Sequence, residues 1–138
     1  MFFPKKTKYK KTFLLIKKGL ECRTNKVLFG SFGIKAINSG FIKSMHIELI
    51  RRLISKHVKK FGKLWIRVYP RTSITRKPTE VRMGKGKGSH SFWAYYARKG
   101  RILFEVKGLT RKKLMDIIFL CNRKLPIKVK LVKNYKFK

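Results

Sequence analysis

Acidic residues are scarce in this sequence. Its 138 residues contain 5 Asp plus Glu against 38 Lys plus Arg, which gives a formal net charge of +33 at pH 7. A compact chain with this charge repels itself, and a polyanion that releases counterions on binding is its best stabiliser. Nucleic acid is the commonest such partner, so the composition predicts a protein that binds nucleic acid.

The shortage of carboxylates also leaves little for catalysis. The five acidic residues are scattered, and none forms a pair or lies beside a candidate nucleophile. They are Glu21, Glu48, Glu80, Glu105 and Asp116. No catalytic residue is expected, and the sequence does not predict an enzyme.

Cysteine is almost as rare. Cys22 and Cys121 lie far apart, with no CxxC pair and no nearby group of histidines. Zinc sites need such clusters, and a disulfide has no support from this spacing. We expect free thiols, no metal site and no cofactor.

Long hydrophobic runs are missing too. The longest, residues 13–16 and 117–121, are far shorter than the roughly 20 residues that span a bilayer. Basic residues extend from Lys5 to Lys138 rather than gathering on one amphipathic helix, so a membrane-surface role is not favoured. Hydrophobic residues still make up 43% of the chain, which is enough for a folded core.

The chain divides into three parts by composition. Residues 1–12 form a basic arm with five lysines and three aromatic residues, residues 13–133 form a single domain, and residues 134–138 form a basic tail. A disordered tail would explain the lysines of the arm. The aromatic side chains favour an arm that becomes ordered against RNA, because they supply stacking faces.

Two segments have the spacing of amphipathic helices. In residues 44–62, Ile47, Ile50 and Ile54 recur at intervals of three and four, with Ser44 as the expected N-cap and Gly62 as the stop. The basic side chains fall on the opposite face, where Glu48 can pair with Arg52.

The second helix is expected over residues 110–124. Thr110 is the candidate N-cap, and Leu114, Ile117, Ile118 and Cys121 share one face. Pro126 ends this helix, because proline cannot continue the hydrogen-bond pattern.

About six strands are expected between and around the helices. Residues 13–42 indicate short strands and turns, in which Gly30 and Gly33 permit a bulge or a close backbone approach. The other predictions are a strand at 63–69, a loop at 71–78, a short strand at 79–83, a hairpin of 91–98 with 101–106, and a strand at 127–132. The succession favours an α+β sandwich, a mainly antiparallel sheet with both helices on one face.

The stretch "RMGKGKG" at residues 82–88 combines glycine with lysine, as nucleotide-binding loops do. It lacks the spacing of both the P-loop and the dinucleotide fingerprint, and a strand follows it rather than a helix. A solvated hairpin tip is one alternative. With the charge of the whole chain, a flexible loop that penetrates RNA is favoured. His90 is expected in the same glycine-rich loop, where contact with RNA is possible.

Five blocks of sequence resemble one family, in order and at matching spacing. They are "PKKTKYKK" (4–11), "FGSFGIKA" (29–36), "GKLWIRVYP" (62–70), "ITRKPTEVRMGKGKG" (74–88) and "LPIK" (125–128). They resemble the bacterial-type large-subunit ribosomal protein sixteen, and the match covers nearly the whole chain.

The resemblance implies a hammerhead-type α+β fold and a place in the large ribosomal subunit, against rRNA beside the aminoacyl-tRNA site. It implies that the arm enters rRNA and that the glycine-rich loop reaches toward the peptidyl transferase centre and the tRNA. The loop residues are Arg82, Met83, Gly84, Lys85, Gly86, Lys87 and Gly88. The residues expected to bind rRNA are Lys5, Lys6, Lys8, Tyr9, Lys10, Lys11, Arg52, Lys56 and Arg67.

The segment "TFLLIKKGLECRTNK" at residues 12–26 departs from the family pattern, which predicts a neighbouring ribosomal protein there. No homo-oligomer is expected. The absence of an arginine- and serine-rich presequence and the bias toward Lys, Ile and Phe favour a mitochondrion-encoded protein of the mitochondrial ribosome. Plastid stroma and bacterial cytoplasm are the alternative locations, and a free RNA-binding module outside the ribosome is the alternative function.

Overall fold

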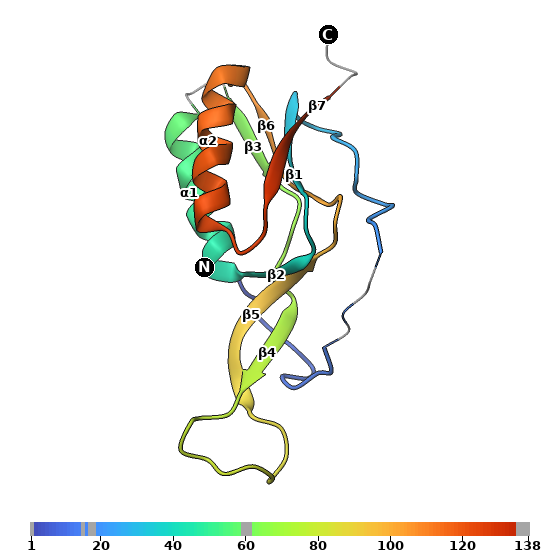
Figure 1. Cartoon of the computed structure of the whole chain (residues 1–138), viewed down its shortest axis with the longest axis vertical. Helices are drawn as coiled ribbons and strands as arrows, with labels where there is room; N and C mark the ends of the chain where they lie inside the picture. The colour runs from blue at the N-terminus through green and yellow to red at the C-terminus, as the bar shows by residue number, and fades with distance from the viewer. Residues whose placement is uncertain (1, 15, 17–18, 59–61, 135–138) are drawn as a thin grey trace.

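The computed structural model describes residues 2–14, 16, 19–58 and 62–134. Two helices and seven strands lie in these ranges (Figure 1). In chain order they are β1 (Phe32–Ala36), β2 (Gly40–Lys43), α1 (Ser44–His57), β3 (Lys63–Ile66), β4 (Thr72–Arg76), β5 (Ser89–Ala97), β6 (Ile102–Lys107), α2 (Arg111–Lys124) and β7 (Val129–Lys133). The predicted α+β class is confirmed.

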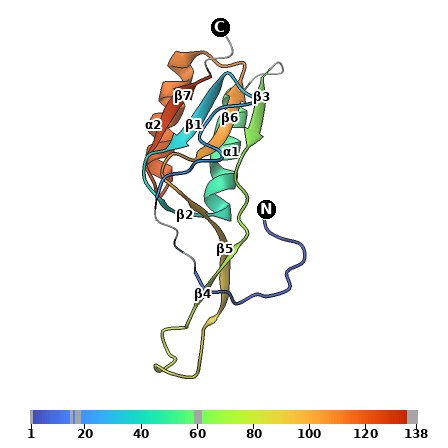
Figure 2. The same ribbon diagram turned by 90° about the vertical axis from the view of Figure 1, so that its right-hand side faces the viewer.

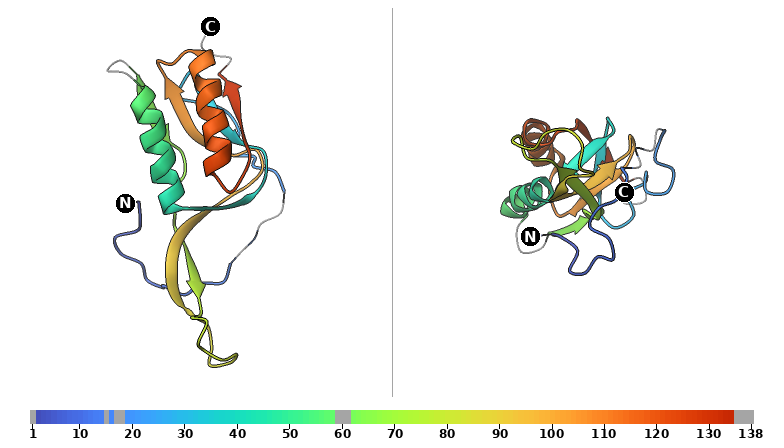
Figure 3. Two further views of the ribbon diagram at one scale, coloured as in Figure 1. Left: turned by 60° about the vertical axis from the view of Figure 1, so that its left-hand side comes forward. Right: turned by 90° about the horizontal axis from the view of Figure 1, so that it is seen from below.

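The strands form two sheets rather than one. A four-stranded sheet has the order β3-β6-β1-β7, and a three-stranded sheet has the order β2-β5-β4. All pairings within both sheets are antiparallel. Helices α1 and α2 lie side by side on one face of the four-stranded sheet (Figure 3), as the sequence predicted for the helices. We call the four-stranded sheet and its two helices the body.

The core of the body lies between the helices and the sheet. The predicted apolar faces supply it: Ile47, Ile50 and Ile54 of α1 are fully buried, as are Leu114 and Cys121 of α2. The sheet contributes side chains of β1, β6 and β7, namely Ile34, Ala36, Phe104, Val106 and Val129. The spacing of three and four residues therefore located the packed faces correctly.

The central strand β6 is buried on both faces, since its residues 102–106 are all buried. Residues 20–31 cover the face that the helices leave open, and Val27 is buried there. A Cβ at Gly30 would lie 2.7 Å from the Val106 carbonyl oxygen, and one at Gly33 would lie 2.6 Å from Val27. The predicted close approach at both glycines is confirmed.

The ends of the first helix were predicted wrongly. Lys43 rather than Ser44 holds the N-cap position, and no side chain caps the first turn. The helix ends at His57, where Val58 donates its backbone N–H to the Ile54 carbonyl, well before Gly62. For α2 the predicted N-cap Thr110 is confirmed, although its hydroxyl makes no capping hydrogen bond.

Three strand predictions were also wrong. Most of the expected loop at 71–78 is strand β4, and the described residues of 79–83 contain no strand. The described residues of 13–31 contribute one isolated bridge, Leu20 to Lys99, where several short strands were expected. Whether such marginal segments pair is decided by a partner strand far along the chain, and local composition does not contain that information.

The expected hairpin of 91–98 with 101–106 does not form. β5 pairs with β2 and β4, while β6 pairs with β1 and β3 in the other sheet. Gly100, with φ of +91°, donates its N–H to the Ala36 carbonyl at 2.9 Å. This turn carries the chain from one sheet to the other instead of folding it back.

The proposed division into arm, domain and tail stays a prediction. Residues 2–14 contain no helix or strand, which suits an extended arm, but the boundary at residue 13 is not marked by any change of structure. Of the tail, only Asn134 is described; its backbone N–H donates to the Ser31 carbonyl at 2.9 Å. Residues 135–138 lie outside the described residues.

Candidate nucleic-acid interface

The strands β4 and β5 form a long ribbon that projects from the body and carries the glycine-rich loop at its end (Figure 1). β2 pairs with β5 only from Gly40 opposite Ala97 to Lys43 opposite Ala94. Beyond Ala94 the ribbon has two strands, down to Arg76 opposite Ser89. The loop is therefore held away from the core at the tip of a hairpin that sequence patterning had not paired correctly.

The backbone of the loop explains its glycines. Gly84, Lys85 and Gly86 have φ of +96°, +51° and +78°, in the left-handed region that glycine adopts without steric cost. At the base of the loop, a Cβ at Gly88 would lie 2.6 Å from the backbone carbonyl carbon of Arg76. The sharp reversal and the tight closure of the ribbon both depend on glycine.

The loop presents its side chains to solvent. Residues 81–87 are all exposed, and Met83 is exposed completely. Among the described residues, Arg82 and Lys85 have no hydrogen-bond or ion-pair partner, while Lys77 donates to the Gly84 carbonyl across the loop. The charges of Arg82 and Lys85 are thus available to an anion.

The arm lies against the ribbon (Figure 2). Lys11 donates from Nζ to the Lys87 carbonyl at 3.2 Å, and Lys87 donates from Nζ to the Thr12 carbonyl at 2.5 Å. The Ser73 hydroxyl of β4 donates to the Lys10 carbonyl. The structure therefore brings together two groups of predicted residues that are more than seventy positions apart in the sequence.

A cleft of about 820 Å³ separates the first part of the arm from the start of β5. It is lined by Pro4, Lys5, Lys6, Thr7, Lys10, Ser89, His90 and Trp93. His90 lies in β5 rather than in the loop; its Nδ1 is 2.7 Å from the Ser73 hydroxyl, and its ring contacts Trp93. We call residues 4–12 with residues 76–90 the arm–ribbon surface.

The remaining predicted residues lie on the body. Arg52 and Lys56 are exposed on α1, and Glu48 accepts hydrogen bonds from Arg51 and Arg52. These hydrogen bonds lower the pKa of Glu48 to about 2. The predicted pairing of Glu48 with Arg52 is confirmed, at 3.0 Å.

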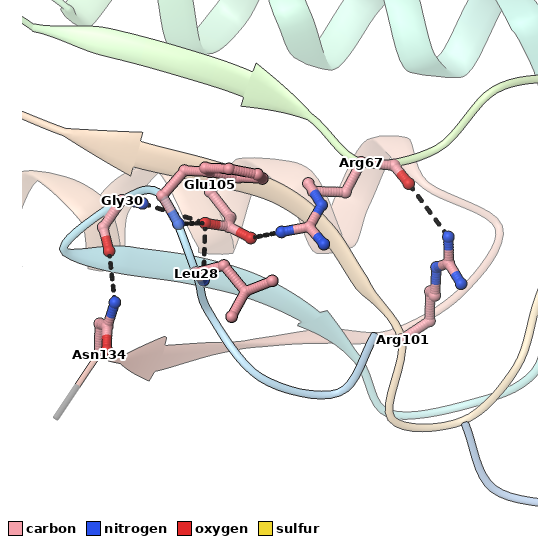
Figure 4. A network of polar contacts seen from close by, with 7 residues as sticks. Leu28, Gly30, Arg67, Arg101, Glu105 and Asn134 are labelled. Carbon is pink, nitrogen blue, oxygen red and sulfur yellow. Dashed lines mark hydrogen bonds and ion pairs between the residues drawn. The ribbon is translucent and has the colours of Figure 1, made fainter. Parts of the chain in front are cut away.

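Arg67 is occupied within the fold (Figure 4). Its guanidinium pairs with the fully buried Glu105 and stacks over the Phe29 ring, and only 13% of its side chain is exposed. Arg101 donates to the Arg67 carbonyl at 3.2 Å. The Arg67 side chain thus pairs with Glu105 and packs on Phe29, which leaves little of its surface for RNA.

Glu105 is the centre of this network, and sequence reasoning gave it no role. Its Oε2 accepts backbone N–H groups of Leu28, Phe29 and Gly30 at 3.1, 2.6 and 3.0 Å. Asn134 closes the other side by donating to the Gly30 carbonyl. The signal in the sequence was a single acid within the apolar strand "ILFEV", where an unpaired charge would be costly.

Other chemistry finds little support in the described part of the chain. Cys22 is exposed, Cys121 is buried and both are free thiols, as predicted. No group of three or more His, Cys, Asp or Glu residues that could hold a metal ion occurs among the residues described. Within the same ranges, neither helix has the length and apolar character needed to cross a membrane.

The chain has a small packed body, a basic arm and a basic loop, and this combination is typical of structural proteins that bind polyanions. Comparison with known proteins identifies the family. Residues 4–132 match the family described as Ribosomal protein L16p/L10e, and the chain belongs to this family. The resemblance to the large-subunit ribosomal protein sixteen is confirmed.

The curated relatives agree over almost the full length. The chain is 43% identical over 134 residues to the large ribosomal subunit protein uL16 of Francisella tularensis subsp. holarctica, in strains FTNF002-00 / FTA, OSU18 and LVS. The match covers 97% of this chain and 98% of each relative. Members of the family are structural components of the ribosome, so the prediction that the chain is not an enzyme is confirmed.

Proposed function

We propose that the chain binds large-subunit rRNA through the arm–ribbon surface and that the glycine-rich loop contacts tRNA in the aminoacyl site, in support of translation. The observation that carries this proposal is the joining of arm and loop. Lys11 and Lys87 each donate to the backbone of the other segment, so both basic segments are presented together at one end of the molecule.

Charge and shape support the same role. Lysines and arginines along the arm and around the loop would replace the counterions of a phosphate backbone, whose release drives binding. The loop lacks bulky packed side chains at its tip, and its glycines let the backbone approach a polyanion closely. A narrow ribbon can reach into folded RNA where a globular body cannot.

The three predicted rRNA contacts on the body differ in how accessible their side chains are to RNA. Arg52 and Lys56 are exposed and stay in the proposal as peripheral contacts. Arg67 is assigned to the core instead, because Glu105 and Phe29 already surround its guanidinium. Neighbouring ribosomal proteins are proposed partners of residues 12–26.

Charge reversal in the loop tests the proposal. The variant Lys85→Glu/Lys87→Glu should impair tRNA accommodation or assembly of the large subunit, since two attractive charges become repulsive. The measurements are subunit profiles on sucrose gradients and tRNA binding to purified ribosomes. The matched control is Lys112→Glu/Lys113→Glu, which reverses two exposed charges on α2 of the body.

Equal behaviour of the two variants, with assembly and tRNA binding at the level of the unaltered chain, would remove the loop from the mechanism. Sedimentation of the unaltered chain addresses the alternative of a free RNA-binding module. We expect it in ribosomal particles after gentle lysis, and recovery outside them would favour the alternative.

The location is proposed as the mitochondrial ribosome in the matrix, on the composition of the sequence alone. The curated relatives named above are bacterial, which accords with the alternative of bacterial cytoplasm. Immunogold labelling with mitochondrial markers, or the genome that encodes the chain, separates these locations.

A further inference from the structure

A second cavity lies between the three-stranded sheet and residues 12–23, and it shares only Thr12 with the arm–ribbon surface. Its volume is about 680 Å³, within the ~300–1,000 Å³ typical of small-molecule sites. Its lining is formed by Thr12, Phe13, Glu21, Cys22, Arg23, Phe41, Arg71, Thr72, Tyr95, Tyr96, Arg98 and Arg101. Most of these residues are basic or aromatic, and the proposed function gives no role to Phe41, Arg71, Tyr96 or Arg98.

Four arginines and one glutamate face this cavity. Arg101 is committed to the fold, since it pairs with Glu21 at 3.4 Å and stacks over the Tyr95 ring. Arg71 and Arg98 differ from it. Within the described ranges neither side chain has a hydrogen-bond or ion-pair partner, although both act on the Tyr95 hydroxyl through their charge. The cavity thus holds positive charge that the protein does not neutralise.

Aromatic rings form an apolar wall of the cavity, beside these arginines. Phe41 of β2 and Tyr96 of β5 are directly opposite in register, and their ring centroids are 4.9 Å apart. Both side chains are half-buried, so each is fixed by packing and still reaches the cavity. Rigid aromatic faces beside arginine are the combination on which unpaired bases of RNA stack.

The cavity is also held open by backbone contacts. Glu21 donates its N–H to the Lys99 carbonyl at 2.9 Å, and Leu20 bridges to Lys99. These contacts join residues 20 and 21 to the connection between β5 and β6, which also carries Arg98. Arg71 directly precedes β4, so both arginines are positioned by the ends of strands.

We propose that this cavity binds one unpaired nucleotide of RNA, with the base against Phe41 and Tyr96 and the adjoining phosphate between Arg71 and Arg98. This inference rests on the proposed function, because it assumes that RNA is the partner. It adds a site that recognises a nucleotide outside a helix, whereas the arm–ribbon surface attracts phosphates of any RNA. Phosphate alone would need no aromatic wall, and a peptide would not need the arginines.

The test compares two RNA hairpins with the full chain at physiological ionic strength. One hairpin carries a single unpaired 2-aminopurine, and the other carries the same base within its paired stem. We expect the unpaired form to bind about tenfold more tightly, since one base stacked on an aromatic side chain contributes on that scale. Its fluorescence should fall on binding, because stacking quenches 2-aminopurine.

Two variants locate the preference. Arg71→Gln/Arg98→Gln should bring the ratio of the two affinities close to one, while Lys112→Gln/Lys113→Gln removes the same charge from α2 and should leave the ratio unchanged. Tyr96→Leu keeps all charges and should abolish the quenching. Circular dichroism verifies that the variants are folded, and the arginine variant decides the matter if Tyr96→Leu does not fold.

The outcomes separate this inference from the proposed function. Equal binding of both hairpins by the unaltered chain, or a ratio that persists in Arg71→Gln/Arg98→Gln, overturns the nucleotide site and leaves RNA binding intact. Failure to bind either hairpin contradicts the proposed function as well.

Discussion

The body and the arm–ribbon surface use the same lysine- and arginine-rich composition in opposite ways. In the body, β6 buries five consecutive residues. The four ion pairs among the described residues join arginines to Glu48 and Glu105 of the body and to Glu21 of the segment that covers it. In the loop, residues 81–87 are all exposed, and Glu80 is the one acid nearby. The acids in these pairs therefore neutralise neighbouring arginines of the fold, whereas Arg82 and Lys85 of the loop have no such partner among the described residues.

This contrast separates stability from recognition. Side chains of the body determine whether the chain folds, because they pack or pair with one another. Side chains of the loop are exposed, and among the described residues Lys87 contacts only the arm, at Thr12 and the adjoining Phe13, so replacement of loop residues should alter binding without altering the fold of the body. The predictions below test that separation, beginning with the largest expected effect.

Glu105→Ala should lower the free energy of unfolding by about 3–5 kcal/mol, because it leaves the Arg67 charge and three backbone N–H groups buried without their acceptor. Urea denaturation followed by circular dichroism measures the change. Glu80→Ala, in the exposed loop region, should stay within about 0.5 kcal/mol of the unaltered chain. Similar losses for both variants would refute the assignment of Glu105 as the centre of the network.

Two glycines give the second comparison. Gly30→Ala should cost about 1–3 kcal/mol of stability, since its Cβ would overlap the Val106 backbone between two packed segments. Gly84→Ala meets nothing within 4 Å, and its left-handed φ should cost no more than about 1 kcal/mol in a loop that can readjust. Thermal denaturation ranks the two, and a larger loss for Gly84→Ala would contradict the contrast.

Lys85→Gln/Lys87→Gln should leave the unfolding transition in place and weaken the salt dependence of RNA binding. Loss of two phosphate contacts lowers the slope of log K against log salt by about 1.5. Fluorescence anisotropy with a labelled rRNA fragment over a range of KCl concentrations gives the slope. The control Lys112→Gln/Lys113→Gln should retain it, and an equal change in both would mean that RNA does not distinguish loop from body.

The smallest effect concerns Glu48. Its pKa is lowered to about 2, so its carboxylate stabilises the fold above the usual carboxyl pKa and that contribution is lost as pH falls toward 2. Glu48→Gln should therefore destabilise the chain at pH 7 by about 0.5 kcal/mol, the scale of a helical surface pair. The difference between the two proteins should vanish near pH 2. A difference that is constant with pH would assign the effect to packing.

Much of the fold was predictable where a local pattern repeats. The isoleucines of α1 are spaced to share one face whatever they pack against, so the helix and its buried face were both located. In the predicted strand 63–69, Leu64, Ile66 and Val68 alternate with Trp65, Arg67 and Tyr69 in the sequence, and these three apolar side chains pack in or against the core. The predictions failed at the ribbon, because Thr72–Arg76 becomes a strand only through its pairing with β5.

The candidate site shows the same division. Arm and loop were each identified from composition and glycine spacing, but their contact through Lys11 and Lys87 joins residues separated by most of the domain. Arg67 was predicted to bind rRNA, and in the sequence it alternates with the packed residues Ile66 and Val68. The covering segment 20–31 lies on that second face, and with Glu105 it turns Arg67 into a buried partner.

The sequence by itself determined the charge of the protein, the two helices, the kinds of residue in arm and loop, and the family, since each depends on composition or on short-range order. The tertiary structure alone decided which strands pair, that Glu21 and Glu105 pair with distant arginines, and that the arm lies against the ribbon. The reason is physical: hydrogen bonds between strands and the burial of a charge involve groups that are distant along the chain, and their energies exist only when the fold brings those groups together.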